Sequence, residues 1–400
     1  MNKRIYLCLA HMSGNEQKYI DEAFESNWVV PLGPNVDGFE ADLHHFMLKD
    51  HPQLEHKQVV ALSSGTAAIH LALLGCGVCP GDEVCVQSFT FCASCNPVRY
   101  VGGVPILIDS EPDTWNMDPT LLEQAIVERK SITGRYPKAI IVVALYGMPY
   151  NIEAIMDIAN RYGIPVIEDA AEGLGSRFDG QALGTFGEYG VLSFNGNKMI
   201  TTSGGGALIC PDMDSKTRTL FYATQARDNY PYYEHTHIGY NYRLSNICAG
   251  IGRGQMTVLN EHIAHHQRLA KMYEKALENI SGLSYHANPD FRYESNYWLS
   301  CITLDERVHV VGEEAVQIEA GQVAPNRNIE ALRIYMDKAG IETRPLWKPM
   351  HLQPIYADAP AYLNGVSEHL FRVGLCLPSG PMVTDEDFDY IITTLKEAIK

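Results

Sequence analysis

The chain has 400 residues, of which 46% are hydrophobic and 20% are charged, and its formal net charge is −17 at pH 7. The length predicts roughly two or three domains, and the composition is that of an ordinary globular protein with sizeable cores. The acidic balance argues against a general nucleic-acid binder and against an anionic membrane surface as a partner. An anionic small molecule would have to be held by local basic side chains or backbone N–H groups.

The N-terminal region contains an apolar run of only six residues, 5–10, which is too short for the core of a signal peptide. No stretch approaches the roughly 18 apolar residues of a membrane-spanning helix. We therefore expect a cytoplasmic protein.

The first two-thirds of the chain alternate helix-like and strand-like segments, which predicts a mostly parallel sheet with crossover helices. A helix is expected over residues 14–26, opened by a capping box of Ser13 and Glu16. Further helices are expected at 65–75 and at 151–163, the latter ending at Gly163. The expected strands lie at 57–63, 83–88, 104–109, 138–145, 164–169, 187–194 and 198–210.

A long helical stretch from Leu244 to about Ile280 is expected to join two domains. The polar and acidic segment 305–328 is interpreted as a loop or insertion. A final helix is expected from about Asp385, with Thr384 as its N-cap.

Among the ten cysteines, two pairs are each separated by two residues: Cys76-x-x-Cys79 and Cys92-x-x-Cys95. Such an array is compatible with a zinc site. However, the first pair straddles a glycine-rich helix exit, and buried reduced cysteines behave as small hydrophobes. We favour the structural interpretation and expect no metal, with a zinc-binding module as the alternative.

Two segments of the predicted sheet carry candidate ligand-binding groups. Ser63 to His70 reads "SSGTAAIH", a strand-to-helix junction whose free N–H groups suit an anion and where Gly65 allows close approach. Asp169 ends an apolar strand and should lie at the carboxyl edge of the sheet, where open α/β folds bind ligands. The alternative for Asp169 is a helix N-cap.

Lys198 lies in the stretch "SFNGNKMITTSGGGALI", between two strand-like segments and without an acidic neighbour in the sequence. A lysine in a partly apolar pocket can serve as a Schiff-base amine, whereas the alternative is a solvated hairpin lysine. The three glycines 204–206 favour the first interpretation, because glycines weaken a strand unless a ligand or another backbone approaches closely. An aromatic and polar cluster, "GYNYRLSN", follows at 239–246. A phosphate seat, an aspartate and a lysine together suit pyridoxal 5′-phosphate.

The ordered set "ALSSGTAAIHLAL", "SFTFCAS", "VIEDAAEGLGS", "SFNGNK", "GYNYRLSN" and "RPLWKPMHLQP" resembles the DegT-like sugar aminotransferases, which are fold-type I enzymes, over nearly the whole chain. The resemblance implies an α/β fold with a mostly parallel central sheet, flanking helices and a smaller C-terminal α+β domain. We expect a large cofactor domain at 1–250, with segment 1–30 near the active site, a connecting helix at 251–280 and a small domain at 281–400.

By this resemblance Lys198 holds the aldehyde of pyridoxal 5′-phosphate as a Schiff base, and Asp169 pairs with the ring nitrogen. The other implied cofactor contacts are Gly65, Thr66 and Ser193 at the phosphate, Phe91 stacked on the ring, Glu172 on the hydroxyl side, and Asn241 at the phosphate of the partner subunit's cofactor. Asn241 in this role implies a homodimer with shared active sites. The residues implied for the nucleotide sugar are Trp28, Val29, Arg344, Trp347 and His351.

The opening segment and "RPLWKPMH" most resemble bacillosamine-type 4-aminotransferases, which act on UDP-linked 4-keto-6-deoxy-N-acetylhexosamines. The implied reaction belongs to class EC 2.6.1, with glutamate as amino donor and a UDP-4-amino sugar as product. Gln87 and Ser203 depart from the family pattern, where proline and glycine are usual, without removing a reacting group. Alternatives are a dTDP-linked keto sugar, a non-catalytic regulatory relative, and a dehydratase. The family's dehydratases carry histidine where this chain has Lys198.

Overall fold

The computed structural model describes residues 4–318 and 323–399. Its main sheet contains eight strands in the order β1-β9-β8-β5-β4-β2-β3-β14. Strand β9 pairs antiparallel with both neighbours, and the other seven strands all run in one direction. The expected mostly parallel α/β sheet is therefore confirmed. The strands are β1 (Gln58–Leu62), β2 (Glu83–Gln87), β3 (Val104–Ile108), β4 (Ala139–Val143), β5 (Val166–Asp169), β8 (Tyr189–Ser193), β9 (Gly206–Cys210) and β14 (Ala361–Tyr362).

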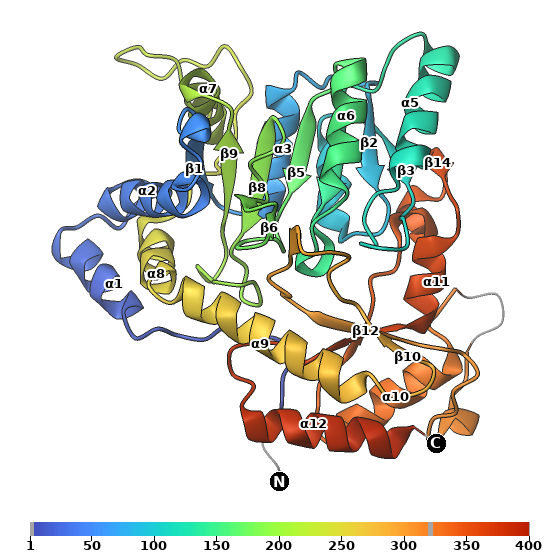
Figure 1. Cartoon of the computed structure of the whole chain (residues 1–400). Helices are drawn as coiled ribbons and strands as arrows, with labels where there is room; N and C mark the ends of the chain where they lie inside the picture. The colour runs from blue at the N-terminus through green and yellow to red at the C-terminus, as the bar shows by residue number, and fades with distance from the viewer. Residues whose placement is uncertain (1–3, 319–322, 400) are drawn as a thin grey trace.

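Helices cover both faces of this sheet (Figure 1). Because successive strand residues point to opposite faces, Val59 and Ala61 join one core whereas Val60 and Leu62 join the other. The first core contains residues of α2 (Pro34–Leu48), α5 (Pro119–Thr133) and α6 (Ile152–Tyr162). The second contains residues of α3 (Gly65–Gly75), α4 (Asn96–Tyr100) and α7 (Met213–Ala223).

A second, antiparallel sheet lies below the main one in Figure 1, in the order β10-β12-β15-β13. It packs with α9, α10 and α12 around a separate core that includes Leu269, Ile302 and Leu395. The strands of this sheet are β10 (Leu283–Tyr285), β12 (Ser300–Leu304), β13 (Arg344–Pro345) and β15 (Gly374–Leu377). The helices in this half of the chain are α9 (Leu259–Leu277), α10 (Arg327–Lys338), α11 (Val366–Val373) and α12 (Asp385–Ala398). The remaining α-helices are α1 (Glu16–Glu25) and α8 (Asn246–Met256), and a small third sheet contains β6 (Arg177–Phe178), β7 (Gln181–Ala182) and β11 (Tyr293–Glu294).

Two segments contact a sheet region that lies outside their own predicted domain. Strand β14, which lies within 281–400, pairs with β3 of the main sheet. Ile5 forms a parallel bridge with Ile341 of the second sheet's region. The boundaries at 250 and 280 stay a prediction.

Helix caps explain several element ends. The side chain of Asn151 accepts a hydrogen bond from Ala154 N, and α6 ends at Gly163 in the left-handed conformation, as expected. Thr384 and Asp387 form a full capping box at the start of α12. The box predicted at Ser13 is only half formed, because Glu16 Oε1 accepts from Ser13 N but Ser13 Oγ accepts from Asn15 N. Helix α1 consequently begins later, at Glu16.

Two other expectations were wrong in extent. The helix expected over 244–280 is broken at Thr257 and Val258 into α8 and α9. The strand expected over 198–210 begins only at Gly206, so Lys198 lies in a turn after β8. Segment 305–328 contains a short 3-10 turn at Glu313–Ala315 and the first two residues of α10, and residues 319–322 lie outside the described part. Within the described ranges no helix is long and apolar enough to cross a membrane.

Candidate active site

A cavity of about 350 Å³ opens at the carboxyl ends of the parallel strands. Open α/β sheets bind ligands at this edge, because the loops after several strands converge there. Its walls come from the turns after β1, β2, β5 and β8, and from two tryptophans far along the chain. The lining residues include Ser64, Gly65, Thr66, Thr90, Phe91, Ser94, Asp169, Ala171, Glu172, Ser193, Asn197, Lys198, Trp298 and Trp347.

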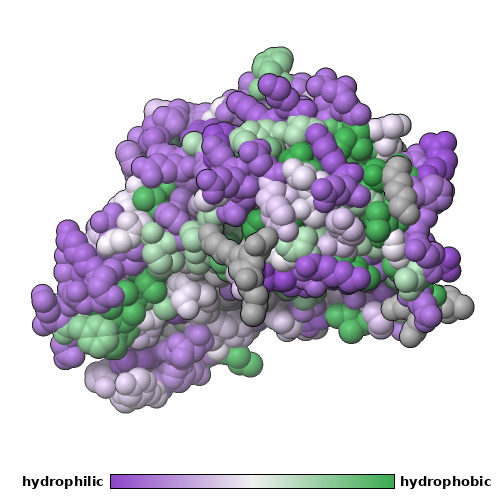
Figure 2. Space-filling model, turned by 90° about the horizontal axis from the view of Figure 1, so that it is seen from below, coloured by the Kyte–Doolittle hydropathy of each residue, from purple (hydrophilic) through white to green (hydrophobic). Residues whose placement is uncertain are grey.

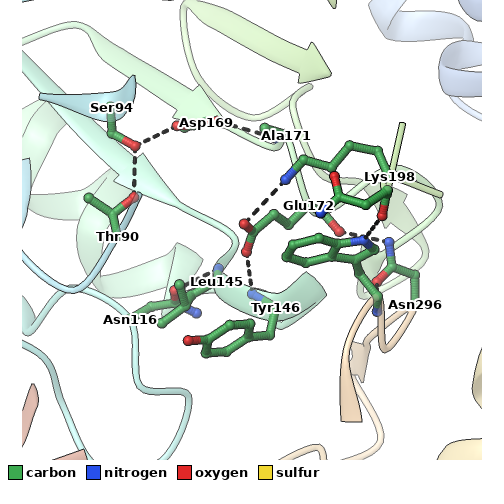
Figure 3. Close-up of polar contacts among 12 residues, drawn as sticks. Thr90, Ser94, Asn116, Leu145, Tyr146, Asp169, Ala171, Glu172, Lys198 and Asn296 are labelled. Atoms are coloured by element: carbon green, nitrogen blue, oxygen red, sulfur yellow. Dashed lines mark hydrogen bonds and ion pairs between the residues drawn. The ribbon is translucent and has the colours of Figure 1, made fainter. Parts of the chain in front are cut away.

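Lys198 projects its amine into this cavity between a carboxylate and an indole (Figure 3). Its Nζ lies 3.3 Å from Glu172 Oε1 and 4.0 Å from the ring centroid of Trp298. The other oxygen of Glu172 accepts a hydrogen bond from Tyr146 N at 2.7 Å. Burial raises the pKa of Glu172, and the charge of Lys198 opposes that rise. Lys198 is therefore a partly buried amine, and not a solvated hairpin lysine.

Asp169 ends β5 and lies 5% exposed in the cavity wall. Its Oδ2 accepts a hydrogen bond from Ser94 Oγ at 2.6 Å and its Oδ1 accepts one from Ala171 N at 3.2 Å. Burial raises the pKa of Asp169, while these hydrogen bonds and the charge of Lys198 lower it. Residues 170–176 form bends and turns, so Asp169 is not a helix N-cap.

The start of α3 forms a compact seat for an anion. Ser64 caps the helix by accepting a hydrogen bond from Ala67 N, which leaves the N–H groups of Gly65 and Thr66 at the cavity. A Cβ atom on Gly206 would lie 2.4 Å from Gly65 N, so glycine is required where β9 crosses this helix end. Close approach of another backbone thus accounts for the third glycine of the triplet. Ser193 also lines the cavity beside Gly65.

A loop from the second half of the chain anchors the lysine turn (Figure 3). Asn296 Nδ2 donates hydrogen bonds to Glu172 O and Leu174 O, both at 2.9 Å. Trp298 Nε1 donates to Asn197 O at 2.6 Å, directly before Lys198. This loop therefore fixes both the strand-end carboxylate segment and the amine.

A second cavity of about 400 Å³ adjoins the first and shares Asn197, Trp298 and Trp347 with it. Arg344 lines it and pairs with Glu342 Oε1 at 2.8 Å, with its side chain 67% exposed. The Tyr6 to Leu9 segment forms another part of its wall. An exposed guanidinium beside a cavity is suited to a phosphate group.

The structure brings most of the predicted site residues together. Lys198, Asp169, Glu172, Gly65, Thr66, Phe91, Ser193 and Trp347 line the first cavity, and Arg344 lines the second. Four predicted residues line neither. Trp28, Val29 and Asn241 are exposed, and His351 Nδ1 is hydrogen-bonded to Ser88 Oγ at 2.7 Å.

Sequence reasoning missed Ser94, Asn296 and Trp298. Ser94 lies in the quoted segment "SFTFCAS", where its spacing of four from Thr90 was the available signal. Asn296 and Trp298 had no local signal, because they meet the site only through the tertiary fold.

The four cysteines of the two C-x-x-C sequence pairs are free thiols in the structure. Cys95 is buried, and burial raises its pKa strongly. Among the residues that the structure describes, no group of three or more His, Cys, Asp or Glu side chains is placed to hold a metal ion.

The first cavity fits pyridoxal 5′-phosphate by its donor set. It offers an amine for an aldehyde, a helix N-terminus for a phosphate and a buried carboxylate for a ring nitrogen. The half-exposed ring of Phe91 lies in the same wall, 5.4 Å from the Trp347 ring.

Comparisons with known proteins agree with this geometry. The model of the DegT/DnrJ/EryC1/StrS aminotransferase family matches residues 10–396. The putative pyridoxal phosphate-dependent aminotransferase EpsN of Bacillus subtilis (strain 168) is 44% identical, over 99% of this chain and 96% of that protein. GDP-perosamine synthase of Escherichia coli O157:H7 is 33% identical, over 96% of each chain. The crystal structure of a DegT/DnrJ/EryC1/StrS aminotransferase from Brucella abortus superposes with a TM-score of 0.83 at 28% identity, over 96% of this chain and 95% of that one.

Proposed function

Because this chain belongs to the DegT/DnrJ/EryC1/StrS aminotransferase family and is a pyridoxal 5′-phosphate-dependent sugar aminotransferase, we propose its substrate and its residue roles. The amino group passes from glutamate to the C4 ketone of a UDP-linked 2-acetamido-4-keto-6-deoxyhexose. The product is a UDP-4-amino-4,6-dideoxy-N-acetylhexosamine, as in bacillosamine-type pathways.

One observation carries this proposal: the Lys198 turn stands where the two cavities meet. Lys198 lines the first cavity, and its neighbour Asn197 lines both. A sugar in the second cavity, with its diphosphate near Arg344, would present its ring carbons to that amine. Trp347 lies in both walls and would pack against the sugar.

The cofactor supplies an aldehyde that takes up amines and a ring that withdraws electrons. Lys198 would bind the aldehyde and, as a free amine, would move a proton to C4 of the sugar. Such positioned proton transfer typically contributes about 10² to 10⁴ in rate. Glu172, at 3.3 Å from Nζ, orients the amine, and Asp169 keeps the ring nitrogen protonated. Gly65, Thr66 and Ser193 hold the phosphate.

The active unit in this proposal is a homodimer. Asn241 is exposed and outside the cavities of its own chain, as a residue that serves a partner's cofactor would be. In Figure 2 hydrophobic residues gather at the left of the lower face, on the side where Figure 1 places α1. The exposed apolar residues next to α1 include Trp28, Val29, Val30 and Leu32. A contiguous exposed apolar patch is typical of a protein interface.

The identity of the nucleotide is tested by comparing the enzyme's activity on different nucleotide-linked sugars. Purified enzyme receives glutamate and one 4-keto-6-deoxy sugar, which is linked to UDP, GDP or dTDP. The release of 2-oxoglutarate gives the rate, and NMR of the product gives the configuration at C4. The proposal expects the highest kcat/KM with the UDP-linked acetamido sugar. The relative that makes GDP-perosamine favours a GDP-linked sugar as the second candidate. A preference for GDP or dTDP would reject the UDP assignment.

A further inference from the structure

A chain of three buried side chains ends at Asp169 (Figure 3). Thr90 Oγ1 lies 2.7 Å from Ser94 Oγ, and Ser94 Oγ lies 2.6 Å from Asp169 Oδ2. Thr90 and Ser94 are each 1% exposed, and Asp169 is 5% exposed. Water therefore has little access to these oxygens, and each depends on the others for its hydrogen bonds.

The direction of this chain follows from proton counting. An ionised carboxylate only accepts hydrogen bonds, and a serine hydroxyl has a single proton to donate. Ser94 donates that proton to Asp169, so Thr90 must donate to Ser94. Both oxygens of Asp169 then receive a donor, Ser94 at Oδ2 and Ala171 N at Oδ1. The whole arrangement is matched to the ionised form of Asp169.

The same turn holds a second feature of the site. Ser94 N donates to Phe91 O at 3.1 Å, within the 3-10 turn Cys92–Ser94 that follows β2. Phe91, Ser94 and Asp169 all line the first cavity. One rigid turn thus sets both the aromatic ring beside the cofactor and the orientation of the carboxylate.

We propose that Ser94, held by Thr90, is a positioning residue that keeps Asp169 ionised and turned toward the ring nitrogen of the cofactor. This inference rests on the role proposed above for Asp169. Without Ser94 the carboxylate loses a charge-assisted donor and becomes more basic, so the shared proton shifts from the ring nitrogen toward Asp169. The ring then withdraws electrons less strongly.

The test uses the full chain loaded with pyridoxal 5′-phosphate labelled with ¹⁵N in the ring. The ¹⁵N chemical shift reports ring protonation directly, and the rate at which glutamate converts the bound cofactor is measured alongside. For Ser94→Ala we expect a shift toward the unprotonated ring and a rate roughly 10-fold lower or more, the usual scale for a lost hydrogen bond to a charged group. Thr90→Val should change both in the same direction by a smaller factor, whereas Thr90→Ser keeps the hydroxyl and the wild-type shift.

Asp169→Asn distinguishes a wrong role for Ser94 from a wrong role for Asp169. If Asp169→Asn changes the ¹⁵N shift but Ser94→Ala and Thr90→Val leave it at the wild-type value, the role of Ser94 is wrong and that of Asp169 stands. If Asp169→Asn itself keeps the wild-type shift and rate, the assignment of Asp169 fails. Thr90→Val is nearly isosteric, so it decides the matter even where Ser94→Ala does not fold.

Discussion

The side-chain nitrogen of Lys198 lies 3.3 Å from Oε1 of Glu172, although 26 residues separate them in the chain. The same carboxylate accepts the backbone N–H of Tyr146. Glu172 therefore connects the Lys198 amine to the turn after β4. Neither Glu172 nor Tyr146 belongs to the turn that carries Lys198.

Replacing Lys198 by alanine should abolish amino transfer, with a loss of roughly 10³-fold or more, because the proton-transferring amine is removed. The visible absorbance of the bound cofactor should shift at the same time. Lys198→Arg is the matched variant, since it keeps the charge beside Glu172 but cannot bind an aldehyde. Full turnover in either variant would overturn the assignment of Lys198.

Glu172→Gln should retain the fold, because the amide oxygen can still accept the Tyr146 N–H. Glu172→Ala leaves that buried N–H without its acceptor, and the free energy of unfolding should fall by about 1–3 kcal/mol. Urea denaturation of the two variants measures the difference. Equal stabilities would show that the contact between Glu172 and Tyr146 contributes nothing.

Trp298→Leu should lower kcat, because both the indole face 4.0 Å from Lys198 Nζ and the hydrogen bond to Asn197 O are lost. A desolvated cation–π contact of about 2 kcal/mol corresponds to roughly 30-fold. Trp298→Phe keeps an aromatic face and should lose less. The idea fails if both variants transaminate at the wild-type rate with unchanged melting temperatures.

The proposed shared site predicts complementation between two inactive variants. Lys198→Ala and Asn241→Ala are each expected to be impaired. When they are unfolded together and refolded as a mixture, one site in each mixed dimer regains both residues, and about a quarter of the wild-type activity should return. Activity no higher than the sum of the separate variants would place Asn241 outside the partner's site.

Glu16 predicts a specific acid sensitivity. Burial alone would raise the pKa of Glu16, but hydrogen bonds from Ser13 and Gln255 lower it from 4.5 to about 2. Because the folded-state pKa is depressed, the stabilisation is present above pH 4.5 and is lost as the pH falls toward 2.

Glu16→Gln should therefore lower the unfolding free energy at pH 7 by about 2–3 kcal/mol and flatten its dependence on pH in that window. The exposed Glu25 of the same helix provides the control variant Glu25→Gln. If Glu16→Gln and Glu25→Gln show the same free energy of unfolding and the same dependence on pH, the hydrogen bonds at Glu16 do not stabilise the fold.

Sequence reasoning reached the elements whose signals are local. Runs of apolar residues predicted the strands that become β1, β2, β3, β4 and β5, and cap residues such as Thr384 marked helix starts. Asp169 was predictable at the sheet edge, because a carboxylate after a buried parallel strand has few other places to lie. Lys198 was distinguished by its glycine-rich surroundings.

What only the tertiary structure decided are contacts between residues far apart in the chain. The loop of Asn296 and Trp298 packs on the Lys198 turn across about 100 residues, and no spacing in the sequence encodes that approach. Strand β9 begins at Gly206, which pairs with Leu62 at the end of β1 and lies against the start of α3. Local propensities predict which segments become strands and helices, whereas the seating of the amine and carboxylates depends on how those elements pack.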